Sequence, residues 1–200
     1  MNDHSKTPSR KKGKVIILIA PSGTGKTTLA KRLLENFPNL KFSVSATTRA
    51  ARPHETHGKD YYFLSDEEFD EAIANGKFLE WEEFYGGVRY GSLISNVEKE
   101  LEKGYFMLFD IEVKGALNVK AHYSDEALAV FIKPPSDSSL IERLRSRGTE
   151  TNETLQLRLD RARMEMEYAD RFDHVIINDD LEQCYKELSE LVATFMNKPQ

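Results

Sequence analysis

Four short runs of apolar residues are spaced along the chain, at residues 15–20, 105–111, 127–132 and 175–178. Continuous apolar runs of this length are typical of strands that are buried on both faces of a parallel sheet. Segments with helical periodicity follow them, at residues 29–34, 138–144, 155–166 and 181–192. Because parallel strands need crossover helices between them, the pattern predicts a three-layer α/β/α body around a central parallel sheet.

Between residues 42 and 91 the pattern changes to short segments that alternate or are rich in aromatic residues, such as residues 60–64 and 78–85. This texture predicts a small insertion with a mixed, mostly antiparallel sheet. Ser65 is followed three residues later by Glu68, which is the spacing of a capping box. One short helix is therefore expected to begin at Ser65.

A phosphate-binding loop follows the first apolar run and precedes the first helical segment. Its residues are Ala20, Pro21, Ser22, Gly23, Thr24, Gly25, Lys26, Thr27 and Thr28. Gly23 and Gly25 allow turns that direct backbone N–H groups inward, and the following helix adds the positive end of its dipole. Lys26 supplies a charge for β- and γ-phosphates, and Thr27 a hydroxyl for Mg²⁺. Ala20 stands where the strict pattern has glycine.

Composition limits the class of protein. A chain of 200 residues that is 40% hydrophobic predicts one α/β domain with insertions. The net charge of −5 argues against a nucleic-acid partner, since proteins that bind nucleic acids usually carry a basic surface.

The single cysteine, Cys184, excludes an intramolecular disulfide and suits a reducing compartment. With neither a membrane span nor a signal peptide in the pattern, we expect a cytoplasmic protein without a membrane partner.

A second candidate phosphate site lies in the insertion. Arg49 and Arg52 are three residues apart, and Tyr61 and Tyr90 carry hydroxyls that could reach the same pocket. Arginine binds phosphate through a planar fork of donors and stays charged, so two such forks and two hydroxyls suit a terminal phosphate. An arginine pair alone is equally compatible with a solvated surface pair.

Several motifs in register along the chain resemble the guanylate kinase family. The signature stretch comprises Thr47-Thr48-Arg49, Arg52, Glu55, Gly58, Tyr61 and Phe63. Further similar blocks are Phe78-Leu79-Glu80-Trp81, Tyr90-Gly91-Ser92, Phe109-Asp110-Ile111, Arg147-Gly148-Thr149-Glu150 and Asn178-Asp179-Asp180. The similarity extends from Gly13 to Met196. The chain departs from the pattern at Glu112, where many members carry Asp.

The resemblance implies ATP-dependent phosphorylation of GMP, with ATP and Mg²⁺ as cofactors. Because the expected contacts involve the base and the phosphate, we expect dGMP to be accepted as well. It implies a guanylate kinase-like domain at residues 14–196. Residues 1–13 are polar and basic, with nothing apolar to bury after Met1, so we expect a flexible basic tail there. The domain divides into a core (14–41, 92–133 and 170–196), a GMP-binding insertion (42–91) and a helical lid (about 134–169). The oligomeric state, monomer or homodimer, stays open.

Residue roles follow from the same resemblance. Catalytic roles fall to Lys26, Arg49, Arg147 and Arg158. ATP is expected on the phosphate loop with Arg143, Arg147 and Asn178. GMP is expected on Ser45, Arg49, Arg52, Tyr61, Glu80, Tyr90, Ser92 and Asp110. Magnesium is expected at Thr27 and Asp110, so Asp110 has two candidate roles, a guanine contact or a magnesium-side carboxylate, and both stay open.

The chemistry of guanine agrees with this assignment. Its N1–H and 2-amino group are adjacent donors that the Glu80 carboxylate can accept together, and Ser45 or Ser92 can donate to O6. Adenine would present an unprotonated N1 to the carboxylate. Two alternatives remain: a catalytically inactive protein-binding module, and a kinase for another mononucleotide. For Arg145, Arg161 and Arg163 the sequence favours pairing with glutamates on exposed helix faces.

Overall fold

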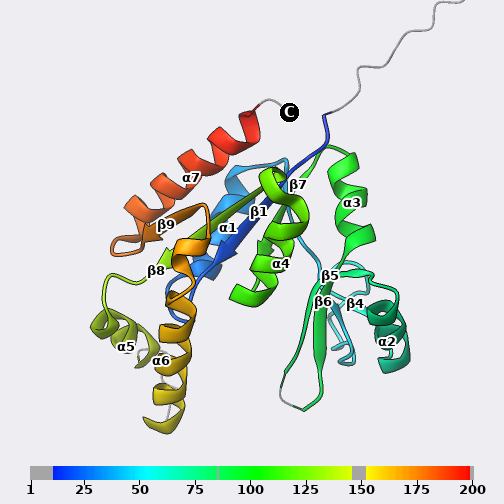
Figure 1. The fold of residues 1–200 in the computed structure, drawn as a ribbon, viewed down its shortest axis with the longest axis horizontal. Helices are drawn as coiled ribbons and strands as arrows, with labels where there is room; N and C mark the ends of the chain where they lie inside the picture. Colours follow the sequence, from blue (N-terminus) through cyan, green and yellow to red (C-terminus); the bar gives the residue numbers. More distant parts are fainter. Residues whose placement is uncertain (1–10, 85, 146–151, 199–200) are drawn as a thin grey trace, which may run out of the picture.

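A five-stranded parallel sheet forms the centre of the protein, in the spatial order β2-β7-β1-β8-β9 (Figure 1). The computed structural model describes residues 11–84, 86–145 and 152–198. The strands of this sheet are β1 (Val15–Ile19), β2 (Leu40–Phe42), β7 (Phe106–Asp110), β8 (Ala127–Lys133) and β9 (His174–Ile177). Every pairing between neighbours is parallel, as the apolar runs predict.

Successive residues of the central strand β1 contribute to two different cores. Ile17 packs in the same cluster as Phe109 and Phe131, while Ile16 belongs to the cluster on the other face. Side chains alternate across a strand, so a strand buried on both faces must be apolar at every position. All five residues of β1 are buried, which explains the unbroken apolar run.

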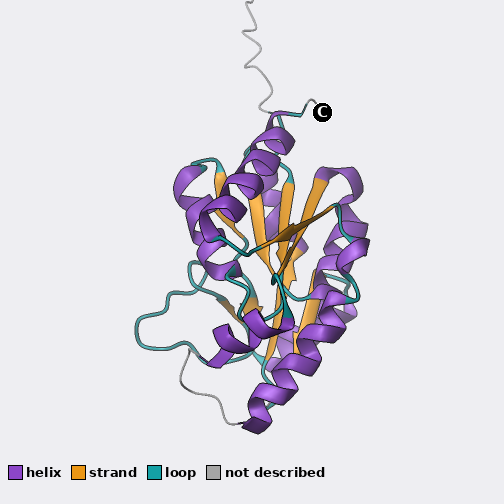
Figure 2. Ribbon diagram, turned by 90° about the vertical axis from the view of Figure 1, so that its left-hand side faces the viewer, coloured by secondary structure: helices purple, strands orange, loops and turns teal. Residues whose placement is uncertain are grey.

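Helices cover both faces of the sheet, giving three layers (Figure 2). The helices outside the insertion are α1 (Lys26–Asn36), α3 (Ile94–Glu102), α4 (Val113–Tyr123), α5 (Asp137–Arg145), α6 (Asn152–Met166) and α7 (Leu181–Asn197), with 3₁₀ turns at Ser124–Glu126 and Ala169–Arg171. Helices α1 and α7 pack in one core cluster, whereas α3 and α4 pack in the other. The predicted α/β/α architecture is confirmed.

The pair α5 and α6 has a small core of its own. Its buried members are Leu140, Leu144, Leu155, Leu159 and Ala162. In Figure 1 the two helices project together below the central sheet, on the opposite side from the second sheet. We call α5 and α6 the lid helices, because they lie in the segment where the sequence predicts a lid.

A four-stranded second sheet has the order β4-β3-β6-β5. Its elements are β3 (Ala46–Thr47), β4 (Tyr62–Phe63), α2 (Asp66–Ala74), β5 (Phe78–Glu83) and β6 (Arg89–Leu93). The sheet is mixed: β3 and β4 run parallel, and β6 pairs antiparallel with both β3 and β5. The predicted capping box at α2 is present, since Ser65 Oγ accepts from the Glu68 N–H and Glu68 Oε2 accepts from the Ser65 N–H.

The alternating segment at residues 42–45 connects the two sheets and forms no strand of the insertion. β2 ends at Phe42 in the core sheet, and the Ser43 N–H still donates to the Leu108 carbonyl of β7 at 2.9 Å. Two residues later, the Ser45 carbonyl accepts from the Tyr62 N–H of β4. The backbone hydrogen bonds therefore pass from one sheet to the other within three residues. A single-sequence pattern cannot show this change of partner.

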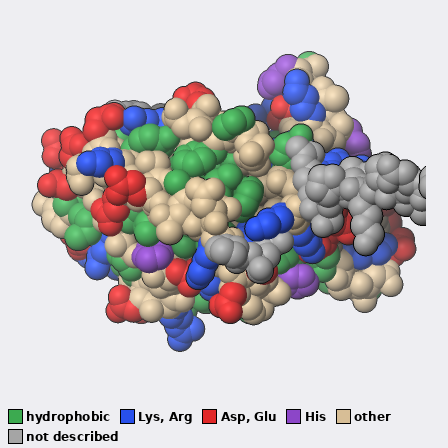
Figure 3. Space-filling view, turned by 90° about the horizontal axis from the view of Figure 1, so that it is seen from above, with side chains coloured by type: hydrophobic (Ala, Val, Ile, Leu, Met, Phe, Trp, Pro, Cys, Tyr) green, Lys and Arg blue, Asp and Glu red, His purple; other side chains and the backbone are tan. Residues whose placement is uncertain are grey.

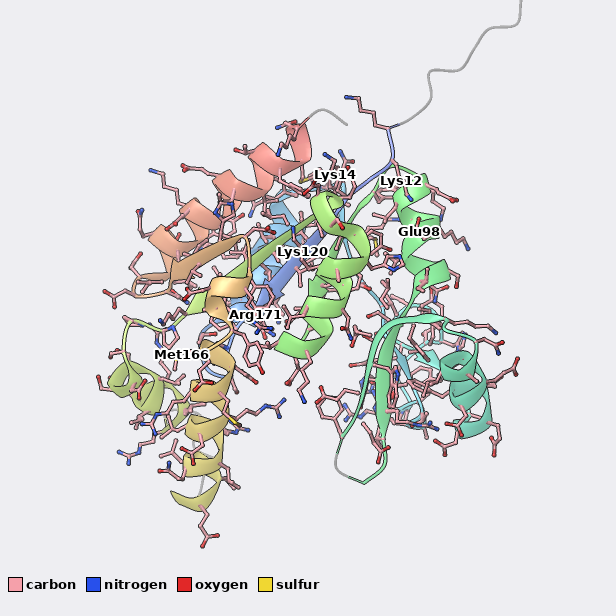
Figure 4. All side chains as sticks on the ribbon, viewed as in Figure 1. Lys12, Lys14, Glu98, Lys120, Met166 and Arg171 are labelled. Carbon is pink, nitrogen blue, oxygen red and sulfur yellow. The ribbon has the colours of Figure 1, made fainter. Side chains whose placement is uncertain are left out.

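The first described residues lie against the core and contact α3. Lys12 Nζ is 2.5 Å from Glu98 Oε2, and the Gly13 N–H donates to the Leu101 carbonyl. Figure 4 places Lys12, Lys14 and Glu98 at the end of the molecule away from the lid helices. Residues 1–10 lie outside the described residues. The predicted tail at residues 1–13 falls mostly outside the described residues, and its last two residues, Lys12 and Gly13, contact α3.

The end of the molecule opposite the lid helices carries mixed charge. Viewed from above in Figure 3, acidic and basic side chains are interspersed there around an area of apolar side chains. Within the described ranges of the chain, no helix combines the length and apolar character needed to cross a bilayer.

Candidate functional site

Two cavities lie next to each other at the carboxyl edge of the core sheet, where ligands of open α/β sheets usually bind. The first, the phosphate cavity, has a volume of about 390 Å³ and is lined by the phosphate loop, the start of α1, Glu112 and α6. The second, the acceptor cavity, has a volume of about 930 Å³ and lies between the second sheet and the core. Lys26 and Glu112 line both cavities, so one wall is shared.

Backbone conformation gives the phosphate loop its cradle shape. Gly23 and Gly25 both have φ of 91°, in the left-handed region that side chains disfavour. Helix α1 begins directly afterwards at Lys26, so its N-terminal N–H groups face the phosphate cavity. The loop is held from behind: Thr24 Oγ1 donates to the Pro21 carbonyl, and Asn178 Nδ2 donates to the Thr24 carbonyl at 2.6 Å. These features make an anion site.

Gly25→Ala is expected to damage this cradle. A Cβ at Gly25 would lie 2.8 Å from Asn178 Nδ2, in addition to the strain of its positive φ. We expect a loss of about 1–2 kcal/mol in unfolding free energy, together with weaker ATP binding because the loop amides turn away. Gly76→Ala is the matched control, since Gly76 also has positive φ but open space around it. Calorimetric titration with ATP would contradict the prediction if both variants bound ATP like the wild type.

Lys26 connects the two cavities. Its Nζ lies 2.6 Å from Asp110 Oδ1 and donates to the Ile111 carbonyl at 3.3 Å. Asp110 is the last residue of β7 and lines the acceptor cavity, but not the phosphate cavity. The carboxylate therefore orients the lysine from the acceptor side. For Asp110 itself, this position favours the guanine side of its two candidate roles.

Glu80 and Ser92 form a polar pair in the wall of the acceptor cavity. Both lie on the second sheet, where β5 pairs with β6, and Ser92 Oγ donates to Glu80 Oε1 at 2.6 Å. Burial raises the pKa of Glu80, and the hydrogen bond from Ser92 opposes this shift. The second carboxylate oxygen, Oε2, lies near Gly115 of α4, where a Cβ would come within 3.1 Å of it. A partly desolvated carboxylate in a cavity wall is suited to recognise paired N–H donors.

Arg49 is held in place beside the acceptor cavity by Glu55. Its two terminal nitrogens donate to the two carboxylate oxygens of Glu55 at 2.7 and 2.8 Å. Its guanidinium lies over the ring of Tyr61, 4.9 Å from the centroid, and Tyr61 and Tyr90 line the cavity. The hydrogen bonds that Arg49 donates to Glu55, and then to Tyr90, raise the pKa of Arg49. Arg49 is therefore a fixed cation at the cavity edge.

The same pair predicts a pH dependence of stability. The hydrogen bond from Arg49, with a second from the Arg52 N–H, lowers the pKa of Glu55 from 4.5 to about 2. A depressed carboxyl pKa stabilises the fold at pH above the unfolded value of 4.5, and this stabilisation is lost as pH falls toward 2. We expect Glu55→Gln to lower the urea midpoint at pH 6, and the difference from wild type to narrow steadily toward pH 2. A difference that stayed constant with pH would contradict this.

The lid helices contribute charged side chains to the phosphate cavity. Arg158, Arg161 and Glu165 of α6 line it together with Glu112. The expectation for Arg161, a helix-surface pair with glutamate, is only half correct. Its Nε donates to Glu165 Oε1 at 3.0 Å, but its Nη2 also pairs with Glu112 of the core. Arg163 pairs away from the cavity, but its partners are the aspartates Asp137 and Asp160 and not the expected glutamates.

The predicted site residues that the structure describes fall mainly into four groups. Ser45, Lys26, Tyr61, Glu80, Tyr90 and Asp110 line the acceptor cavity, and Ala20, Pro21, Ser22, Gly23, Gly25, Lys26, Thr27, Thr28 and Arg158 line the phosphate cavity. Thr24, Ser92 and Asn178 are buried and support residues that line the cavities. Arg143 donates to the Asp179 carbonyl, the side chain of Arg52 is exposed, and neither residue lines a cavity. The predicted catalytic Arg147 lies outside the described residues.

Sequence reasoning missed the functional positions of Arg161, Glu165 and Glu55. One signal was available: Arg161 follows Arg158 by three residues and Glu165 follows Arg161 by four, so all three share one face of α6. Glu55 was part of the signature stretch, yet only the structure shows that it orients Arg49.

Magnesium fits this site as a nucleotide-bound ion. Among the described residues, no group of three or more Asp, Glu, His or Cys side chains is arranged to hold a metal. Mg²⁺ in nucleotide sites needs only one or two protein oxygens, because phosphates and water supply the rest. Thr27, in the first turn of α1, lines the phosphate cavity and can provide such an oxygen.

Comparison with known proteins agrees with the geometry. The family model described as Guanylate kinase matches residues 12–195. A guanylate kinase of Salinibacter ruber is 52% identical over 183 residues, covering 92% of this chain and 97% of the relative. One from Chlorobium luteolum is 47% identical over 188 residues, covering 94% and 95%. The crystal structure of guanylate kinase from Anaplasma phagocytophilum, 34% identical, covers 94% of this chain and 88% of that protein with a TM-score of 0.69. The chain therefore belongs to the guanylate kinase family.

Proposed function

We propose that this protein transfers the γ-phosphoryl group of ATP to GMP, forming ADP and GDP. The observation that carries the proposal is the shared wall of the two cavities. Lys26 faces both the phosphate loop and the cavity that contains the Glu80–Ser92 pair and borders Arg49. The γ-phosphate of ATP and the phosphate of GMP can therefore approach each other at the Lys26 ammonium group.

In the phosphate cavity, the loop amides, the N-terminus of α1 and Lys26 bind the triphosphate of ATP. Mg²⁺ held at Thr27 would neutralise charge on the β- and γ-phosphates. Arg158 faces this cavity from α6 and is placed to stabilise charge on the transferred group. Arg147 is proposed to have the same role as Arg158.

In the acceptor cavity, Glu80 accepts from N1–H and the 2-amino group of guanine while Ser45 donates to O6. Ser92 orients Glu80 through its hydrogen bond, and the absence of a Cβ at Gly115 leaves room for Glu80 Oε2. Arg49, Tyr61 and Tyr90 bind the GMP phosphate, and Arg52 is proposed to join them. That phosphate is an anionic nucleophile, so no protein base is required, and transfer depends on position and electrostatics. Closure of the lid helices would exclude water and protect ATP from hydrolysis.

The test is ADP release in a coupled assay with ATP and Mg²⁺, comparing GMP, dGMP, AMP, dTMP and no acceptor. We expect ADP with GMP and dGMP, because the proposed contacts involve only base and phosphate. Equal rates with AMP would favour a kinase for another mononucleotide. GMP binding without ADP release would favour a binding module. The intact Lys26 and Thr27 in the phosphate cavity support the enzyme.

A further inference from the structure

Arg161 forms a bridge between two carboxylates inside the phosphate cavity. Its Nε donates to Glu165 Oε1 at 3.0 Å, one turn along α6, and its Nη2 pairs with Glu112 Oε2. Glu112 is the residue that precedes α4 on the core, so the bridge joins the lid helices to the wall shared by both cavities. All three residues line the phosphate cavity.

Two carboxylates are unexpected neighbours for a triphosphate, because like charges at this range repel. Glu165 is only 15% exposed, so solvent screens it poorly. Burial raises the pKa of Glu165, whereas its hydrogen bond with Arg161 and the charges of Arg161 and Lys26 lower it. Without a cation between them, Glu112 and Glu165 would make the cavity less favourable for ATP.

Arg163, two residues further along α6 than Arg161, has a different environment. Arg163 pairs with Asp137 of α5 and with Asp160, and it does not line the cavity. Arg161 and Arg163 therefore have the same charge, the same helix and similar exposure, 49% and 53%. Of these two arginines, Arg161 is the one that pairs with carboxylates lining the phosphate cavity.

We propose that Arg161 is a positioning residue of the ATP site. It compensates the charges of Glu112 and Glu165 and thereby permits the triphosphate to enter the phosphate cavity. This inference rests on the function proposed above, and it adds a determinant of ATP affinity outside the residues expected to contact the transferred phosphoryl group. Because its action passes through two carboxylates, its loss is expected to weaken ATP binding more than it slows turnover.

The first experiment compares Arg161→Ala with Arg163→Ala. For Arg161→Ala we expect the KM for ATP and the Kd of a non-hydrolysable ATP analogue to rise about tenfold. This is the effect expected when one uncompensated carboxylate repels the triphosphate and solvent partly screens the repulsion. We expect kcat to change by less than about threefold. Arg163→Ala should stay within about twofold of wild type in both constants. Similar ATP affinity in the two variants would overturn the proposal.

The second experiment separates charge compensation from direct phosphate contact. Adding Glu165→Gln to Arg161→Ala should recover most of the lost ATP affinity, because it removes one repelling carboxylate. Absence of recovery would overturn the proposal in favour of a direct contact. If Arg161→Ala does not fold, the single variant Glu165→Gln tests the proposal. Because it removes one repelling carboxylate, we expect it to bind the ATP analogue more tightly than the wild type does. Unchanged or weaker binding of the analogue would overturn the proposal. A wild type that makes no GDP would refute the proposed function, whereas analogue binding still tests Arg161.

Discussion

Lys26→Ala is expected to lower kcat by about 10³-fold while the fold stays intact. The lysine lines both cavities, and its Nζ lies 2.6 Å from Asp110 Oδ1. A preorganised cation at the point where charge develops is worth 10²–10³ in rate, and here it also aligns donor with acceptor. Steady-state kinetics with saturating ATP and GMP measure the effect.

The control for Lys26→Ala is Lys31→Ala, on the exposed surface of the same helix. It removes the same charge from α1 but lies outside both cavities. We expect it to keep wild-type kcat within about twofold. If circular dichroism shows both variants to be folded and Lys26→Ala keeps wild-type kcat, the catalytic role of Lys26 at the wall shared by the two cavities is refuted.

Glu80→Gln is expected to raise the KM for GMP by about 10²-fold. The carboxylate can accept both adjacent guanine donors, whereas the amide presents one acceptor and one donor, so a guanine N–H meets an N–H. Leaving a buried polar group mismatched in this way costs a factor of this size. The KM for ATP should change little, because Glu80 lines only the acceptor cavity.

Stability separates this loss of recognition from damage to the fold. Burial raises the pKa of Glu80, so ionising this carboxyl costs folding free energy once the pH rises above the ordinary carboxyl pKa. Glu80→Gln removes the cost, and we expect a thermal midpoint equal to or above that of wild type at pH 7. Glu67→Gln, on the exposed surface of α2, is the control for GMP binding. If Glu80→Gln leaves the KM for GMP unchanged, Glu80 does not recognise the guanine base.

The sequence is sufficient to predict the core sheet and the phosphate loop because both follow from local rules. Strands buried on both faces must be apolar throughout, as β1 is, and the loop needs Gly23 and Gly25 at fixed spacing before a helix. The capping box at Ser65 is similarly local. The edge strand β2 is less obvious, since its three residues are not all buried and its partner β7 is distant in sequence.

Supporting roles could not be predicted because they depend on contacts between distant segments. Asn178 reaches the Thr24 carbonyl across 154 residues, and Arg161 reaches Glu112 across 49. Spacing on α6 places Arg161 near Glu165, but only the packing of the lid helices beside the core brings it to Glu112. For such residues, sequence indicates a charged helix surface, and the structure shows which charges meet.

The most direct test of the central claim follows the phosphoryl group itself. The protein is incubated with Mg²⁺, GMP and ATP labelled at the γ-phosphate, and the nucleotides are separated. The account predicts that the label appears in the β-phosphate of GDP, in equal amount to the ADP formed, with little free phosphate. Label released as inorganic phosphate, or retained in ATP while GMP is bound, would contradict direct transfer between the two cavities.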